Sequence, residues 1–206
     1  KSKKNRILKS RVDGTEAISE ALSKLSNPPK TFISASAIGF YGNRGTEDIS
    51  EVSKKGEGFL ADVCEQWEQS AQKAKDIGIR VIHPRIGIVI SGKGGALAPM
   101  TLPFSLGLGG PMGSGQQYMS WISIDDILDM FLWMLTNTNI EGVVNLTNPN
   151  PVTNRDFLKV CIFVFRFKNQ DWMFIEVLNI YGEFTWTANS RKRSCFRRGS
   201  GSFGSR

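Results

Sequence analysis

The stretch Ser-Ala-Ser-Ala-Ile-Gly-Phe-Tyr-Gly, residues 34–42, decides how the rest of the chain is interpreted. It follows directly on Thr31-Phe32-Ile33, a short run of β-branched and aromatic residues that favours a strand. Small residues and two glycines then replace this pattern, as happens where a strand runs into a loop. We therefore expect a strand over residues 31–36 that carries Ser36 at its carboxyl end, with Tyr41 in the loop beyond it.

On both sides of this strand, apolar residues recur at the spacing of a helix. The pattern before the strand runs from Ile7 to Leu25 and stops at Asn27-Pro28-Pro29, because proline cannot continue a helix. The pattern after it runs from Phe59 to Ala74, and Gly78 suits the end of that helix. The expected strand therefore lies between two expected helices.

Strands and helices continue to alternate further along the chain. Residues 79–90 are rich in Ile and Val and predict a buried strand, interrupted by a proline and a glycine. Ser123 and Thr153 each stand three residues before an Asp, a capping-box spacing that predicts a helix at each point, and residues 142–147 predict a strand between them. The eight glycines of residues 91–115 could equally cradle a ligand or make turns. The alternation predicts an α/β fold with a parallel sheet.

The length and the charge of the chain limit the class of protein to which it can belong. A chain of 206 residues with 40% hydrophobic content suits one domain. The net charge of +7 would favour a nucleic-acid-binding protein, but eleven of the 26 Lys and Arg residues lie in residues 1–10 and 191–206. The remaining 15 Lys and Arg residues are outnumbered by the 19 Asp and Glu residues, all of which lie in residues 11–190. This part of the chain is therefore mildly acidic, and we expect no nucleic-acid partner. We expect the basic tail to be disordered from about residue 188.

The cysteines and the apolar runs give further limits. Cys64, Cys161 and Cys195 fit neither a disulfide framework nor a metal-binding pair, and the chain has a single histidine. We therefore expect no metal, and a reducing compartment, which is the cytoplasm or the stroma or matrix of an organelle. No apolar run approaches the roughly 20 residues that a membrane-spanning helix needs, so no membrane partner is expected.

Residues 34–42 resemble the serine-containing strand end and Tyr-Gly of the extended short-chain dehydrogenases, the NAD-dependent epimerase/dehydratase family. Four stretches resemble the atypical epimerase-like branch of that family: FLADVCEQWE (59–68), KGGALAPM (93–100), PFSLGLGGPMGSGQQYMSWISIDD (103–126) and NPNPVTNRDF (148–157). The resemblance implies the carboxyl-terminal part of a Rossmann-type, doubly wound parallel sheet that binds NAD or NADP and a small-molecule substrate. It divides the chain into residues 1–159, part of such an NAD(P)-binding domain, and a divergent tail, residues 160–206.

The resemblance also implies roles for residues near the strand end. Ser36 would be catalytic, donating a hydrogen bond to a substrate oxygen, and Tyr41 would be a second catalytic group beside it. Ser34 would contact the cofactor. The alternative for both serines is ordinary hydrogen bonding within a loop.

The turn after the next strand and one tryptophan complete the expected site. Arg85, Ile86 and Gly87 resemble the turn that contacts the nicotinamide in the family, and Trp121 would wall a substrate pocket. The alternative for Arg85 is a buried ion pair with a carboxylate such as Asp125, and for Trp121 it is packing in the core.

Two departures from the family bear on function. The Tyr-x-x-x-Lys pair that moves protons in the superfamily aligns with Phe59 and Val63, neither of which can move a proton. The resemblance begins in the helix before the fifth strand, after the glycine-rich turn that holds the pyrophosphate in the family. The sequence predicts an NAD(P)-dependent oxidoreductase or epimerase-like protein, inactive as this chain alone. The alternative is a catalytically silent module that binds a partner or senses a dinucleotide.

Overall fold

The computed structural model describes residues 2–91, 94–96, 98–106 and 108–166. The chain forms two compact units, and each is built from two segments. The first unit contains the residues up to Ile86 together with Asp129–Asn145, and the second contains Gly87–Leu128 and the described residues from Leu146 onward. Most of the predicted divergent tail, residues 167–206, lies outside the described residues.

The sheet of the first unit is organised around strand β3 (Arg80–Ile86). Strands β1 (Thr31–Ile33) and β2 (Ser36–Ala37) both pair with β3 in parallel, and their register continues unbroken across the two residues that separate them. Strand β8 (Gly142–Leu146) also pairs with β3. The parallel pairing is thus confirmed for β1 and β2 against β3, although the strand predicted over residues 31–36 is divided in two and the one predicted over residues 79–90 is interrupted after Ile86. The chain has the α/β class that was expected.

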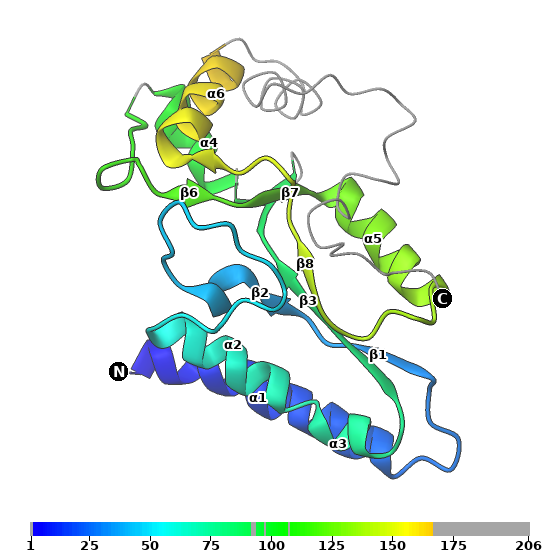
Figure 1. Cartoon of the computed structure of the whole chain (residues 1–206). Helices are drawn as coiled ribbons and strands as arrows, with labels where there is room; N and C mark the ends of the chain where they lie inside the picture. Colours follow the sequence, from blue (N-terminus) through cyan, green and yellow to red (C-terminus); the bar gives the residue numbers. More distant parts are fainter. Residues whose placement is uncertain (1, 92–93, 97, 107, 167–206) are drawn as a thin grey trace. The chain divides into compact units, whose positions relative to one another are not determined.

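Helices α1 (Ser2–Ser23), α2 (Phe59–Gln69) and α3 (Gln72–Asp76) lie together along one side of this sheet (Figure 1). The apolar core of this region consists of the small and β-branched side chains of Ala71, Ala74, Ile79 and Val81, against which the partly buried Leu22 of α1 and Phe32 of β1 pack. The helix predicted over residues 59–74 is interrupted after α2. The Ser70 hydroxyl donates to the Trp67 carbonyl at 2.6 Å there, the kind of local bond that competes with a helix.

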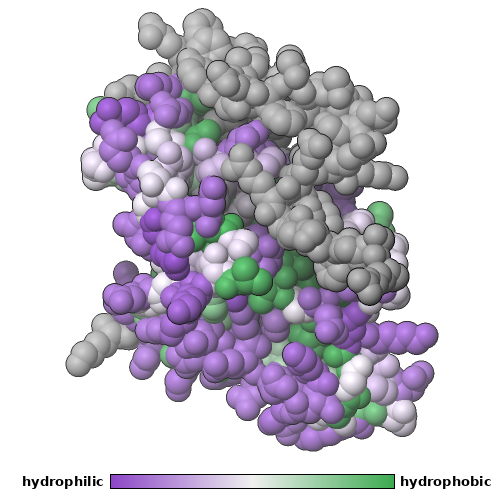
Figure 2. Space-filling view, viewed as in Figure 1, coloured by the Kyte–Doolittle hydropathy of each residue, from purple (hydrophilic) through white to green (hydrophobic). Residues whose placement is uncertain are grey.

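The buried face of α1 differs from the one that its apolar spacing indicates. Ile18 is 52% exposed, whereas the buried residues of this helix are Thr15 and Ser19. The indole of Trp67 donates to the Thr15 hydroxyl at 3.0 Å, and the Ser19 hydroxyl accepts from the Ala74 amide at 2.8 Å. Helix α1 therefore docks through hydrogen bonds, and hydrophilic side chains cover much of the surface over α1–α3 in Figure 2.

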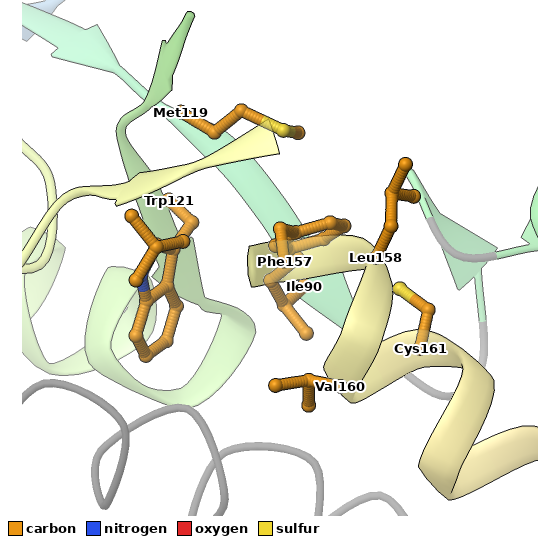
Figure 3. Close-up of a cluster of buried hydrophobic side chains, with 8 residues drawn as sticks. Ile90, Met119, Trp121, Phe157, Leu158, Val160 and Cys161 are labelled. Carbon is orange, nitrogen blue, oxygen red and sulfur yellow. The ribbon is translucent and has the colours of Figure 1, made fainter. Parts of the chain in front are cut away.

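The second unit holds a three-stranded and a two-stranded sheet. In the first, β4 (Ile88–Ser91) lies between β7 (Trp121–Ser123), which is parallel to it, and β5 (Gly94–Gly95), which is antiparallel. In the second, β6 (Tyr118–Met119) and β9 (Val152–Thr153) are antiparallel. Helices α4 (Ala98–Ser105) and α6 (Asn154–Arg166) contact each other. Figure 3 shows the core that these elements share, made of Ile90, Met119, Trp121, Val152, Phe157, Leu158, Val160 and Cys161.

Two helix starts carry the capping boxes that the sequence predicts. Before helix α5 (Ile124–Thr136), the Ser123 hydroxyl accepts from the Asp126 amide at 3.0 Å and donates to its carboxylate at 2.7 Å. Before α6, Thr153 makes the same two contacts with Asp156, at 3.2 and 2.6 Å. These bonds satisfy amides that a helix start leaves without partners. Among the described residues, no helix is both long and apolar enough to cross a membrane.

Candidate functional site

The candidate site lies at the carboxyl ends of β2 and β3 in the first unit. The register places Ser36 opposite Arg85, and the chain then turns into the short 3-10 helix η1 (Ile38–Tyr41), which carries Tyr41. The following loop returns to this point, where the Gly56 amide donates to the Phe40 carbonyl at 2.9 Å. A Cβ at Gly56 would overlap the Tyr41 carbonyl, so the close return needs a glycine. Backbone geometry therefore gathers Ser36, Tyr41 and Arg85.

An ion pair between Arg85 and Glu68 forms the centre of the site. Both partners are largely buried, with side chains 4% and 13% exposed. The Arg85 Nε and Nη2 atoms each donate to a Glu68 carboxylate oxygen at 2.8 Å, the two-pronged geometry that suits guanidinium and carboxylate. The sequence predicted a carboxylate partner such as Asp125 as the alternative for Arg85, and the partner is Glu68. Glu68 falls at helical spacing from the buried Ala61 and Cys64, a signal that could have identified it.

Two hydroxyl groups are bound into this ion pair. The Ser36 hydroxyl donates to Glu68 Oε1 at 2.6 Å, and Arg85 Nη1 donates to the Tyr41 hydroxyl at 2.9 Å. The Tyr41 hydroxyl donates in turn to Asn145 Oδ1 at 2.7 Å. The result is a chain of hydrogen bonds that joins β2, α2, β3, η1 and β8.

Aromatic rings and a second carboxylate enclose the cluster. The Arg85 guanidinium lies 3.3 Å from the centre of the Phe40 ring, in a cation–π contact. Phe40 and Tyr41 meet edge to face at 5.4 Å between ring centres. Glu51 accepts the Asn145 amide at 2.9 Å. The charge of Arg85 is thus held between a carboxylate on one side and aromatic rings on the other.

Burial changes the proton affinities of groups in and around the cluster. It raises the pKa of Tyr41, although the hydrogen bond and the charge of Arg85 act in the opposite direction. Burial also raises the pKa of the Cys64 thiol and lowers the pKa of His83, whose Nδ1 lies 3.3 Å from the Ser34 carbonyl. At neutral pH Tyr41 is therefore a protonated phenol, able to donate and accept hydrogen bonds.

The other predicted site residues make structural contacts. Ser34 is 5% exposed, and its amide donates to the Ile82 carbonyl at 2.9 Å. Ile86 ends β3. In the second unit, the Gly87 amide donates to the Leu146 carbonyl at 3.0 Å, and a Cβ at Gly87 would lie 2.7 Å from the Ser120 carbonyl oxygen. The cofactor roles of Ser34, Arg85, Ile86 and Gly87 remain predictions.

Trp121 belongs to the core of the second unit. It is 1% exposed and packs among the residues of Figure 3, while its indole nitrogen donates to the Asn150 carbonyl at 3.2 Å. This is the packing that the sequence offered as the alternative to a pocket wall. Its role in substrate binding remains a prediction.

The two positions that align with the superfamily's tyrosine and lysine lie near the start of α2. Val63 is 3% exposed, and the Lys4 ammonium stands 5.0 Å from the centre of the Phe59 ring. Neither side chain can take up or release a proton. Any proton transfer in this chain requires a different group.

The chain is similar to curated proteins over most of its described length. An epimerase family protein of Mycobacterium tuberculosis is 42% identical over 154 residues, which are 75% of this chain and 50% of the relative. One of Bacillus subtilis is 37% identical over 157 residues, 76% of this chain and 52% of the relative. The chain spans about half the length of these relatives. No family model matches it.

Two solved structures of epimerases are also similar to this chain. A nucleoside-diphosphate sugar epimerase from Corynebacterium glutamicum superposes with a TM-score of 0.71 at 36% identity, covering 93% of this chain and 43% of that one. The human epimerase family protein SDR39U1, crystallised with NADPH, gives 0.75 at 31% identity and covers 80% of this chain and 56% of that one. Over the residues that these proteins match, the chain belongs to the epimerase family of the extended short-chain dehydrogenase/reductase superfamily, with its Rossmann-like fold.

Proposed function

We propose that this chain supplies the substrate side of an NAD(P)-dependent, epimerase-like site. The observation that carries the proposal is the gathering of Ser36, Tyr41 and Arg85 at the carboxyl ends of parallel strands. Ligands of doubly wound sheets lie outside those ends. A relative with 31% identity was crystallised with NADPH, which supports the choice of cofactor.

The residues of this edge fit the nicotinamide end of such a cofactor in place and in chemistry. Ser36 and Tyr41 offer two hydroxyl groups held by fixed partners, and Arg85 offers a charge that is already compensated. A nicotinamide dinucleotide supplies hydride chemistry at a carbon that bears oxygen. The chain's own part would be to hold that oxygen through Ser36 and Tyr41, whose hydroxyl protons are donated to Glu68 and Asn145 in this structure and would have to turn to the substrate oxygen.

For the substrate, we propose a nucleoside-diphosphate sugar. The support is the name of one relative, a nucleoside-diphosphate sugar epimerase that shares 36% of its residues with the aligned part of this chain. A sugar hydroxyl at the reacting carbon matches the hydroxyl-rich edge around Ser36 and Tyr41.

The test joins this chain to the amino-terminal half of the mycobacterial relative. We expect the 206-residue chain alone to bind NADPH weakly, since phosphate anchoring at a glycine-rich helix start lies outside the resemblance, and the fusion to bind it well. The fusion is then assayed for nicotinamide reduction with a panel of nucleotide sugars. Losing one positioned donor costs about a hundredfold in rate, so Ser36→Ala should reduce turnover by that factor. Unchanged turnover in Ser36→Ala would refute the role of Ser36.

A second candidate function is a silent module that binds a partner or senses a dinucleotide. Two observations favour it: Phe59 and Val63 stand where the superfamily moves protons, and the hydroxyls of Ser36 and Tyr41 are engaged within the protein. The fusion protein distinguishes the two functions. NADPH binding without turnover on the whole panel supports the silent module, and turnover that depends on Ser36 supports the enzyme.

A further inference from the structure

The Tyr41 hydroxyl stands in an unusual electrostatic position. Arg85 from β3 donates to it at 2.9 Å, and because a guanidinium has donors only, the phenol must accept. Its own proton therefore points to Asn145 of β8 at 2.7 Å. Tyr41 is 4% exposed, so these neighbours, and not water, decide how firmly the phenol holds its proton.

Glu68 acts on this phenol through Arg85. It takes the Nε and Nη2 donors, which leaves Nη1 directed at Tyr41. It also compensates much of the positive charge that would otherwise favour a phenolate. Glu51, from the loop that returns to Gly56, adds a second negative charge that disfavours the phenolate. His83, also on β3, interacts electrostatically with both Glu68 and Arg85.

We infer that Glu68 is a positioning residue that, through Arg85, sets how readily Tyr41 releases its proton. The inference rests on the proposed function, in which Tyr41 holds the reacting oxygen. The arrangement is a carboxylate, a guanidinium and a phenol in line, drawn from α2, β3 and η1, and none of the three falls at the positions of Phe59 and Val63. The positive charge of Arg85 favours release of the Tyr41 proton, and the negative charge of Glu68 reduces this effect.

The ultraviolet absorbance of tyrosinate tests this inference without cofactor or substrate. The chain has three tyrosines, and Tyr41→Phe identifies the part of the alkaline titration that belongs to Tyr41. Arg85→Met should move this part to higher pH by about one unit or more, because a neighbouring cation is lost. Glu68→Gln should move it to lower pH, because the cation is then uncompensated. Arg85→Lys keeps the charge and should restore much of the wild-type titration.

Two further variants serve as controls for this titration. Arg85→Met leaves the Glu68 carboxylate buried without its partner, so the double variant Arg85→Met/Glu68→Gln provides a neutral version, which should also titrate above the wild type. Asp62→Asn removes an acid of the same helix that is paired with Lys55 at the surface, and should leave the titration unchanged. Circular dichroism at each pH confirms that the protein is folded.

Opposite shifts in Arg85→Met and Glu68→Gln support the inference. Shifts of the same sign, or a Tyr41 titration that does not move in folded variants, overturn it. Because no ligand is involved, this failure is distinct from failure of the proposed function, which would appear in the fusion protein as absent NADPH binding or as NADPH binding without turnover. Either result can occur without the other.

Discussion

At the scale of single residues, partly buried charged side chains hold segments of the chain together. Arg80 shows this outside the candidate site: its Nη1 donates to the carbonyls of Met134, Asn137 and Ile140, and its Nη2 donates to the Thr31 hydroxyl at 2.8 Å. These carbonyls lie in and just beyond the last turn of α5, where a cation also interacts favourably with the helix dipole. One side chain thus ties β1 and β3 to the end of a helix.

Replacing this side chain should be costly. Arg80→Met removes hydrogen bonds from a charged donor and leaves several carbonyls without partners, so we expect a loss of about 2–3 kcal/mol in the free energy of unfolding. Urea denaturation measures the change. Lys24→Met is the control, because its pair with Glu20 is exposed to solvent and should contribute little to stability. Equal losses in the two variants would contradict the role assigned to Arg80.

His83 predicts how stability depends on pH. Burial lowers its pKa in the folded state below the ordinary 6.5, so between the two pKa values the unfolded chain binds more protons than the folded one. Stability should therefore decrease as pH falls through 6.5, and His83→Gln should remove that part of the decrease. Because His83 is the single histidine, comparing urea midpoints of the two proteins from pH 7 to 5 isolates the effect. Parallel curves would show that His83 does not titrate differently on unfolding.

The sequence predicted some site residues and missed others for physical reasons. Ser36, Tyr41 and Arg85 lie in or shortly after the last residues of parallel strands, and a parallel sheet brings such ends together, so their proximity could be predicted, while their roles remain predictions. Glu68 was missed because a glutamate on a helix usually faces water, and only its spacing from Cys64 indicates burial. Asn145 contacts Tyr41 across 104 positions of the chain, a pairing that no local pattern contains.

At the scale of helices and strands, some features could likewise be predicted from the sequence and others could not. The parallel pairing of β1 and β2 with β3 was expected from the alternation of strands and helices, and both capping boxes follow from residue types three positions apart; these predictions are confirmed. The buried face of α1 does not follow from hydrophobicity, because Thr15 and Ser19 gain partners from α2 and α3. Hydrogen bonds between elements override the apolar pattern there.

Two glycines of the first unit should respond oppositely to alanine. A Cβ at Gly56 would overlap the Tyr41 carbonyl, so Gly56→Ala must displace the loop or η1 and should cost about 1–3 kcal/mol. Gly14 lies within α1, and a Cβ at this position would have no neighbouring atom within 4 Å. Gly14→Ala should therefore stabilise the folded protein by up to about 1 kcal/mol. Thermal unfolding of both variants checks the signs. A stable Gly56→Ala would show that the loop can shift freely.

At the scale of the whole molecule, helix α5 carries a stripe of exposed apolar side chains. Ile124, Leu128, Leu132 and Leu135 recur at helical spacing and are 39%, 62%, 62% and 54% exposed. A continuous apolar stripe of this kind favours association in water.

We therefore expect this chain to associate in solution. Light scattering after size-exclusion chromatography should show species larger than 22.9 kDa, increasing with concentration. The double variant Leu128→Glu/Leu132→Glu should shift the distribution towards the monomer, because charge on the stripe opposes contact between apolar surfaces. A monodisperse wild-type monomer at every concentration would mean that the stripe does not drive association.

The chain passes from one compact unit to the other three times, after Ile86, Leu128 and Asn145, and this has a consequence for synthesis on the ribosome. Strand β3 emerges before its partner β8, and residues 87–128 emerge between them. The first unit therefore cannot complete its sheet until residue 145 has left the exit tunnel, when much of the second unit is already outside. A nascent chain stalled after Leu128 would expose β3 along the side that β8 later covers, and would be a substrate for ribosome-associated chaperones.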